Sequence, residues 1–152
     1  MEFSDTITIY RPVETVWQCL LDLDHYPAWY PGLTTISGTL APDEILQLDL
    51  TLGSRRIRPR VRIIAFEPGR VLAWRGSLFG ESPLQPLFSI IRRFEMHPVD
   101  ATTTHFSNRE RFCGIIGAPL GLIGRSRLEP RYHMLNRSLR EHCKHCPLEE
   151  KR

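Results

Sequence analysis

Three polar side chains lie on strand faces that are otherwise apolar. Arg92 comes two residues before Phe94, and because side chains alternate along a strand, these two residues share one face. By the same alternation, Asn108 and Glu110 share a face with Phe106. Buried polar groups need partners, and the two segments are expected to be neighbouring strands. We therefore predict that Arg92 and Glu110 face the interior and pair across it.

The chemistry that Arg92 and Glu110 offer has two interpretations, and the sequence leaves both open. In the functional one, they are catalytic candidates: an acid–base couple, or a polar anchor for a carbonyl or carboxylate of a ligand. In the structural one, they form an ion pair without a role in binding, or a β-bulge turns one of them outward.

The same interior would present ligand-binding side chains from the sheet and from the last helix. Core packing is the alternative role, and it is the expected one for at least half of the strand aromatics. The ligand-binding candidates are Trp74, Phe94, Phe106, Asn108 and Phe112 on the strands, and Tyr132, Leu135 and Asn136 on the helix.

The C-terminal run from His142 to Cys146 contains two histidines and two cysteines, which are ligands of the kind that zinc prefers. His142 and Cys146 share one helical face, whereas Cys143 faces the core, and no second Cys/His cluster exists. We therefore predict a frayed helix end and no metal site. The glycine-rich segment 114–124 does not follow a buried parallel strand, so it is predicted to be a flexible entry to the last helix rather than a phosphate loop.

Positive charge is concentrated in one short segment. Arg56, Arg58, Arg60 and Arg62 alternate with other residues and are expected on one strand face. Such a face suits an interaction module, although a solvated outer face is the simpler interpretation. The net charge of +3 is too small to indicate a nucleic-acid partner.

Bulk composition is that of one domain with a real core. The chain has 152 residues, of which 41% are hydrophobic and 24% charged. No apolar run is long enough to cross a bilayer, and the first ten residues do not resemble a secretory signal. A cytoplasmic location is expected, and the four cysteines are expected to be free thiols.

The elements that position these residues follow from periodicity. A strand is predicted from Phe3 to Tyr10, followed by a short helix after Pro12 and a helical turn over 24–32. Period-two alternation over about 34–112 indicates about six strands joined by short turns, hence an antiparallel meander. A long helix over about 124–142 presents Leu128, Tyr132, Leu135, Leu139 and Cys143 on one face.

This order predicts an α+β fold in which a curved antiparallel sheet of about six to seven strands surrounds a long C-terminal helix, with two short helices after the first strand. Residues 1–146 are expected to form a single ligand-binding domain, and residues 147–152 a disordered tail.

Two early motifs add a family resemblance. The motif residues are Pro12, Val16 and Trp17, followed by Asp22, Tyr26, Pro27, Trp29 and Pro31. With these motifs the chain resembles the SRPBCC superfamily of START-like and birch-pollen-allergen-like helix-grip proteins, and in particular its polyketide cyclase/dehydrase-like branch.

The resemblance implies the helix-grip fold and a cavity for a small hydrophobic molecule, such as a polyketide, phenolic or lipid-like compound. A cofactor-independent cyclase/dehydratase-like enzyme, a non-enzymatic carrier or sensor, and an interaction module remain alternatives. We expect no cofactor, no nucleic-acid partner, and a monomer or homodimer.

Overall fold

The computed structural model describes residues 1–77 and 82–146, so the predicted disordered tail lies outside the described residues. Its main element is one antiparallel sheet with strand order β1-β8-β7-β6-β5-β3-β2, and β4 pairs with β3. The strands are β1 (Glu2–Ile9), β2 (Leu33–Ser37), β3 (Ile45–Leu52), β4 (Arg55–Ile57), β5 (Arg60–Glu67), β6 (Val71–Gly76), β7 (Ser89–Asp100) and β8 (Thr103–Cys113).

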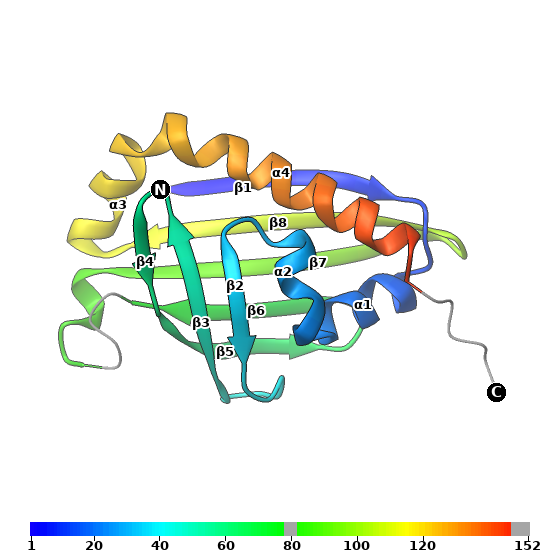
Figure 1. Cartoon of the computed structure of the whole chain (residues 1–152), viewed down its shortest axis with the longest axis horizontal. Coiled ribbons are helices and arrows are strands. Elements are labelled where there is room, and N and C mark those ends of the chain that lie inside the picture. Colours follow the sequence, from blue (N-terminus) through cyan, green and yellow to red (C-terminus); the bar gives the residue numbers. More distant parts are fainter. Residues whose placement is uncertain (78–81, 147–152) are drawn as a thin grey trace.

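Helices lie at the two ends of the sheet and across it. α4 runs from α3 at one end of the molecule to α1 at the other and lies beside β1, along one side of the curled sheet (Figure 1). The predicted α+β helix-grip fold is confirmed. The helices are α1 (Val13–Leu21), η1 (Leu23–His25), α2 (Tyr26–Trp29), η2 (Gln85–Leu87), α3 (Gly114–Ile123) and α4 (Arg125–Lys144).

The sheet contains eight strands, one more than the upper end of the predicted range. The additional strand is β4, which pairs with the end of β3 to form a short hairpin. Gly53 lies in the turn of this hairpin with a φ of 61°. Glycine adopts this left-handed conformation without the steric cost that a Cβ imposes.

Alternation along the two longest strands matches the prediction. In β8 every second residue from Thr104 to Phe112 is buried, and the residues between them are intermediate or exposed. Antiparallel pairing places Arg92 of β7 directly opposite Glu110 of β8, with no bulge between them. The inward orientation of both side chains is therefore confirmed.

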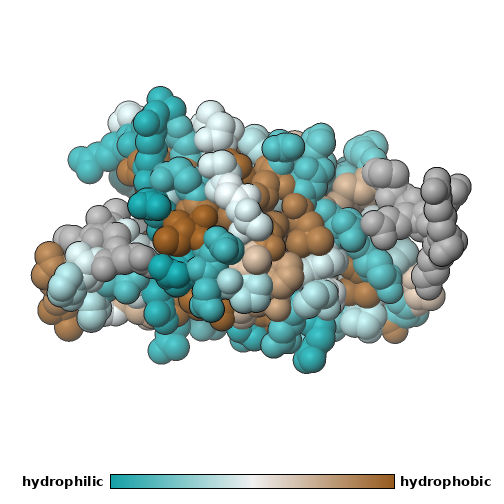
Figure 2. Space-filling model, turned by 90° about the horizontal axis from the view of Figure 1, so that it is seen from below, coloured by the Kyte–Doolittle hydropathy of each residue, from teal (hydrophilic) through white to brown (hydrophobic). Residues whose placement is uncertain are grey.

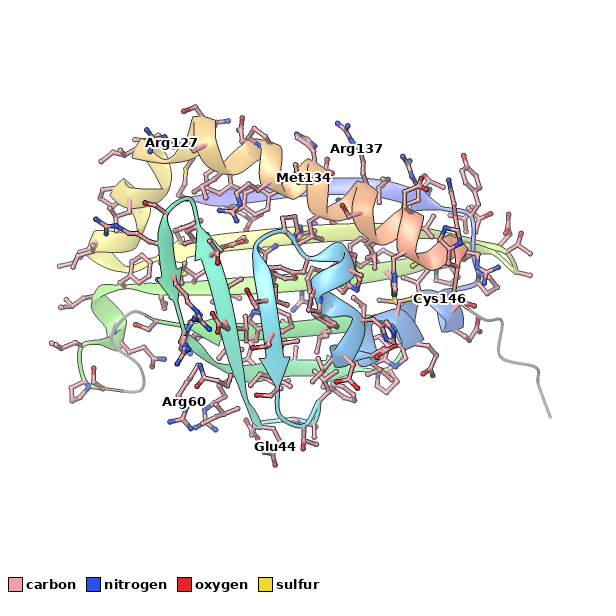
Figure 3. The ribbon with its side chains drawn as sticks, in the orientation of Figure 1. Glu44, Arg60, Arg127, Met134, Arg137 and Cys146 are labelled. Carbon is pink, nitrogen blue, oxygen red and sulfur yellow. A yellow bond between two sulfur atoms is a disulfide. The ribbon has the colours of Figure 1, made fainter. Side chains whose placement is uncertain are left out.

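α4 packs on the sheet through the predicted stripe. Leu135, Leu139 and Cys143 are almost completely buried, whereas Met134 is 56% exposed and points away from the sheet (Figure 3). The helix continues through Pro130. The break in the helical segment falls at Gly124, between α3 and α4, and not at the proline.

The glycine-rich segment before α4 is a helix, so the prediction of a flexible entry is wrong. Gly121 of α3 is buried, and a Cβ at this position would lie 3.2 Å from Cγ of Phe112 and 3.0 Å from Cγ of Met1. The absence of a side chain lets α3 approach β8 closely. Here glycine serves close packing, which periodicity alone does not distinguish from flexibility.

The aromatic motif before β2 fills the space between the sheet and α4. Tyr26 and Trp29 of α2 are buried, and the Tyr26 hydroxyl donates a hydrogen bond to the carbonyl of Leu20. The Trp29 ring lies edge-on to Phe94 of β7, with ring centroids 6.3 Å apart. Among the described residues, no helix combines the length and the hydropathy needed to cross a bilayer.

The packing of α4 yields a test with a matched control on the same helix. Leu139→Ala removes a side chain with no exposed surface, so it should lower the free energy of unfolding by about 2–5 kcal/mol. Met134→Ala, on the outer face, should change it by no more than about 0.5 kcal/mol. Urea unfolding followed by circular dichroism measures both. Equal effects of the two substitutions would mean that α4 does not pack as described.

Candidate functional site

A cavity of about 210 Å³ lies between the sheet and the first half of α4. Most of its wall is apolar. Leu52, which is 41% exposed, belongs to this wall, so the cavity reaches the surface beside the β3–β4 hairpin. The apolar lining includes Leu48, Leu50, Ile57, Val61, Trp74, Phe88, Ile90, Phe112, Leu128 and Leu135.

Arg92 and Glu110 form the buried charged part of the wall, and the half-buried Arg131 of α4 also lines the cavity. The side chains of Arg92 and Glu110 are 10% and 11% exposed, and Nη2 of Arg92 donates a hydrogen bond to Oε2 of Glu110. Nη1 of Arg92 donates a second hydrogen bond to Oδ1 of Asn108, at 2.8 Å. The three predicted polar residues therefore form one buried cluster, in which the carboxylate and the amide both accept from the guanidinium.

Two tyrosines lie over the guanidinium. The carbon Cζ of Arg92 is 5.3 Å from the ring centre of Tyr30 and 5.4 Å from that of Tyr132, within the range of cation–π attraction. The hydroxyl of Tyr132 is buried beside the carboxylate of Glu110, and this burial, followed by the charge and hydrogen bonding of Glu110, raises the pKa of the phenol. Because Tyr132 lines the cavity, it belongs to the polar cluster that a bound molecule would meet.

Electrostatics keep these groups in defined protonation states. Burial is the largest single influence and lowers the pKa of Arg92. The charge and hydrogen bond of Glu110, together with Tyr30 and Tyr132, outweigh burial, and the pKa of the guanidinium lies above the usual value. Burial, and then the charge of Glu110, raise the pKa of Tyr132. At neutral pH the cavity therefore presents a guanidinium cation and a phenol that still carries its proton.

The structure brings some of the predicted ligand-binding residues to the cavity and places others elsewhere. Trp74, Phe112, Tyr132 and Leu135 line the cavity, as do Arg92 and Glu110. Phe94 and Phe106 do not line it. They are fully buried and pack against each other in the core, with ring centroids 5.6 Å apart.

The two predicted asparagines lie behind this wall. Asn108 supports Arg92, as described above, and does not line the cavity. Asn136 donates a hydrogen bond from Nδ2 to Oδ2 of Asp5 at 2.8 Å, which ties α4 to β1. Both amides therefore have structural contacts.

Sequence reasoning missed Tyr30 and the residues that β3, β4 and β5 contribute to the wall. Tyr30 follows α2 in the turn before β2, where no periodic pattern indicates the direction of a side chain. Its place beside two motif residues, Trp29 and Pro31, was the available signal.

The four alternating arginines share one outer face, as predicted. β4 and β5 pair with β3 in one continuous register, in which Ile57 lies opposite Leu50 and Arg60 opposite Gln47. The residues between the arginines, Ile57, Pro59 and Val61, line the cavity on the other face. Arg56 Nε donates to Asp49 at 2.8 Å, and Arg58 Nε lies 3.6 Å from the same carboxylate. Arg60 points outward (Figure 3), and the face seen in Figure 2 mixes hydrophobic with hydrophilic residues.

The prediction of four free thiols is also wrong, because the structure joins Cys19 to Cys146 by a disulfide. Cys113 and Cys143 are free. The pair is 127 positions apart in the sequence, and only the packing of α4 on α1 brings the two residues together. The predicted frayed end is instead helical up to Lys144.

Solved structures with the same fold have little sequence identity to the chain. The Zhui aromatase/cyclase from Streptomyces sp. R1128 is 15% identical over 95% of this chain and 93% of its own, with a TM-score of 0.73. Ara h 8.0201 is 11% identical over 95% and 97%, with a TM-score of 0.70. A protein from Arthrobacter aurescens is 14% identical over 99% and 91%, with a TM-score of 0.74.

These likenesses support the fold, and no curated protein sequence matches the chain. A family model provides the assignment. The model described as "Polyketide cyclase / dehydrase and lipid transport" matches residues 1–144, nearly the whole chain. The chain therefore belongs to the polyketide cyclase/dehydrase and lipid transport family.

Proposed function

We propose that this protein binds a small, largely apolar molecule that carries an oxygen atom at one end. One observation carries the proposal: a buried polar cluster of Arg92, Glu110 and Tyr132 lies on the wall of a largely apolar cavity. Binding sites for small molecules combine such apolar walls with a few placed polar groups.

Cavity size limits the ligand. An apolar protein cavity of ~150 Å³ accommodates benzene, and this cavity of about 210 Å³ is moderately larger. A phenolic or ketonic compound with one or two rings fits this volume, whereas a long polyketide would have to extend through the opening beside Leu52. Burial of apolar surface supplies about 25 cal/mol per Å².

The polar groups determine the orientation of the ligand. Its apolar body lies against Trp74 and Leu135, and its oxygen accepts hydrogen bonds from Tyr132 and Arg92. The family description, which names polyketide cyclases and lipid transport, supports a ligand of this class. The Zhui aromatase/cyclase, which has the same fold, supports it as well.

The bicyclic phenol 2-naphthol tests this proposal by fluorescence titration. We expect micromolar binding to the unmodified protein and none to Leu135→Trp, which fills the cavity. Tyr132→Phe removes one hydrogen-bond donor and should weaken binding up to about tenfold, since one hydrogen bond contributes roughly 0.5–1.5 kcal/mol.

Tyr10→Phe is the matched control, because Tyr10 is 75% exposed and does not line the cavity. It should leave the affinity unchanged. Undiminished binding to a folded Leu135→Trp protein would refute the assignment of the ligand to this cavity.

A second candidate function is catalysis of cyclisation or dehydration. It is favoured by the position of Glu110, whose carboxylate lines the cavity beside two hydrogen-bond donors. As general base, Glu110 takes a proton from the carbon next to a ligand carbonyl. The electron pair moves to the carbonyl oxygen, where Arg92 and Tyr132 stabilise the enolate. The enolate carbon then attacks a second carbonyl of the ligand, and Glu110 returns its proton to the alkoxide that forms. Loss of a second α-hydrogen together with this hydroxyl, as water, completes ring formation.

A carrier would need only the cavity, so enzyme and carrier differ in whether Glu110 contacts reacting atoms. The bicyclic ketone 2-tetralone distinguishes them, because exchange of its α-hydrogens for deuterium in D₂O reports enolisation by NMR. For an enzyme, the unmodified protein accelerates the exchange, and Glu110→Gln reduces this acceleration at least tenfold while 2-naphthol still binds.

Glu129→Gln is the control, since Glu129 forms a largely exposed ion pair with Arg125 and does not line the cavity. The Glu129→Gln variant should accelerate the exchange of the 2-tetralone hydrogens as much as the unmodified protein does. Glu110→Gln should also lower the free energy of unfolding by roughly 3–5 kcal/mol, because it leaves Arg92 without its counter-charge. Circular dichroism therefore checks that the variant is folded. Exchange at the uncatalysed rate in the unmodified protein would favour the carrier.

A further inference from the structure

Three side chains with metal-binding atoms meet where the end of α4 packs on α1. Cys19 of α1, His142 of α4 and Cys146 place their ligand atoms within 4.8 Å of one another. His142 and Cys146 are four positions apart and share one face of the helix end. Cys146 lies beside α1 in Figure 3. In the sequence, only His142 and Cys146 were recognisable as a possible group of ligands. The fold brings Cys19 close to them.

The ligand set suits a thiophilic cation. Two thiolates and an imidazole are common ligands of structural Zn²⁺. With Zn–S bonds of about 2.3 Å and Zn–N bonds of about 2.0 Å, tetrahedral ligand atoms lie roughly 3.3–3.8 Å apart. Ligand atoms that lie within 4.8 Å of one another need shifts of roughly 1–1.5 Å to reach these separations, and the two sulfurs move apart once their bond is cleaved.

A second histidine lies close to this cluster. The ring centroids of His25 and His142 are 6.0 Å apart. Nδ1 of His25 is 2.6 Å from Oδ2 of Asp22. A carboxylate that accepts the Nδ1 proton leaves Nε2 as the nitrogen with the lone pair, which is the usual arrangement around a metal-bound histidine. Asp22 therefore leaves Nε2 of His25, whose side chain is 63% exposed, available to a cation.

The surroundings suit a structural site rather than a catalytic one. Cys19 is 2% exposed, and His142 and Cys146 are half-buried. Arg11 donates a hydrogen bond to the carbonyl of Cys146 and so fixes the chain end against α1. A cation bound here would cross-link the last turn of α4 to α1. This link would hold the helix in its position over the cavity.

We propose that the reduced protein binds one Zn²⁺ or a similar thiophilic divalent cation through Cys19, His142, Cys146 and His25. A thiol or phosphine reductant first supplies the two electrons that cleave the Cys19–Cys146 bond, and two protons complete the thiols. The cation then displaces these two protons as both sulfurs become thiolates. The disulfide in the oxidised protein and the metal ion in the reduced protein are alternative cross-links between α1 and the end of α4.

Titration of the reduced full-length protein with Co²⁺, followed by Zn²⁺, tests the proposal. We expect one equivalent of Co²⁺ to produce the thiolate-to-cobalt charge-transfer absorption and the intense visible bands of a tetrahedral site. Zn²⁺ should abolish both and raise the melting temperature. The oxidised protein should show neither absorption.

Variants locate the site. Cys19→Ser and Cys146→Ser should each eliminate the charge-transfer absorption or reduce it to that of one thiolate. Cys143→Ser and Cys113→Ser are the matched controls, because these cysteines are not in the cluster, and both should keep the full absorption. His142→Ala and His25→Ala should each weaken Co²⁺ binding at least tenfold.

Circular dichroism confirms that each variant is folded. The absence of stoichiometric Co²⁺ binding by the folded, reduced protein would overturn the proposal, as would loss of the absorption in Cys143→Ser with retention in Cys19→Ser. Undiminished binding to His25→Ala would remove His25 from the site.

Discussion

The hydrogen-bonded pair of Arg92 and Glu110 constrains the rest of the site. Two charges on the inner face of a sheet are costly to bury unless each has a partner with good geometry. Direct pairing of their positions in β7 and β8 supplies that geometry, and Asn108 adds an acceptor for the guanidinium. The register of these two strands therefore determines where the only buried ion pair between side chains of the described residues lies.

The pair also explains why the two halves of α4 differ. The first half presents Leu128, Tyr132 and Leu135 to the cavity, and Tyr132 lies over the guanidinium. The second half presents Leu139 and Cys143 to the main hydrophobic core, and it ends against α1 at the Cys19–Cys146 link. The first half of α4 thus covers the cavity, and the second half anchors the helix to the rest of the protein.

Alternation was sufficient to predict the inner face of the sheet. Arg92, Asn108 and Glu110 were assigned to the interior because strand side chains point to opposite faces in turn, and no bulge interrupts β7 or β8 at these positions. The stripe on α4 followed in the same way from helical period. Both predictions rest on long regular elements, where local pattern and tertiary position agree.

The errors fall where position depends on the path of the chain. Phe94 and Phe106 share the inner face with Glu110 but lie farther along the sheet, against Trp29 and away from the cavity. Tyr30 reaches the cavity from a turn, and Cys19 meets Cys146 across 127 positions. Contacts between segments that are far apart in the sequence depend on how the elements pack, and the pattern within one segment carries no information about that packing.

The most direct test of the central claim, that the polar cluster receives the oxygen of an apolar ligand, is a crystal structure of the protein with 2-naphthol. The account predicts that the rings lie between Trp74 and Leu135, with the hydroxyl oxygen within hydrogen-bond distance of Tyr132 or Arg92. A ligand bound outside the cavity, or bound within it with its oxygen at the opening beside Leu52, would contradict the account.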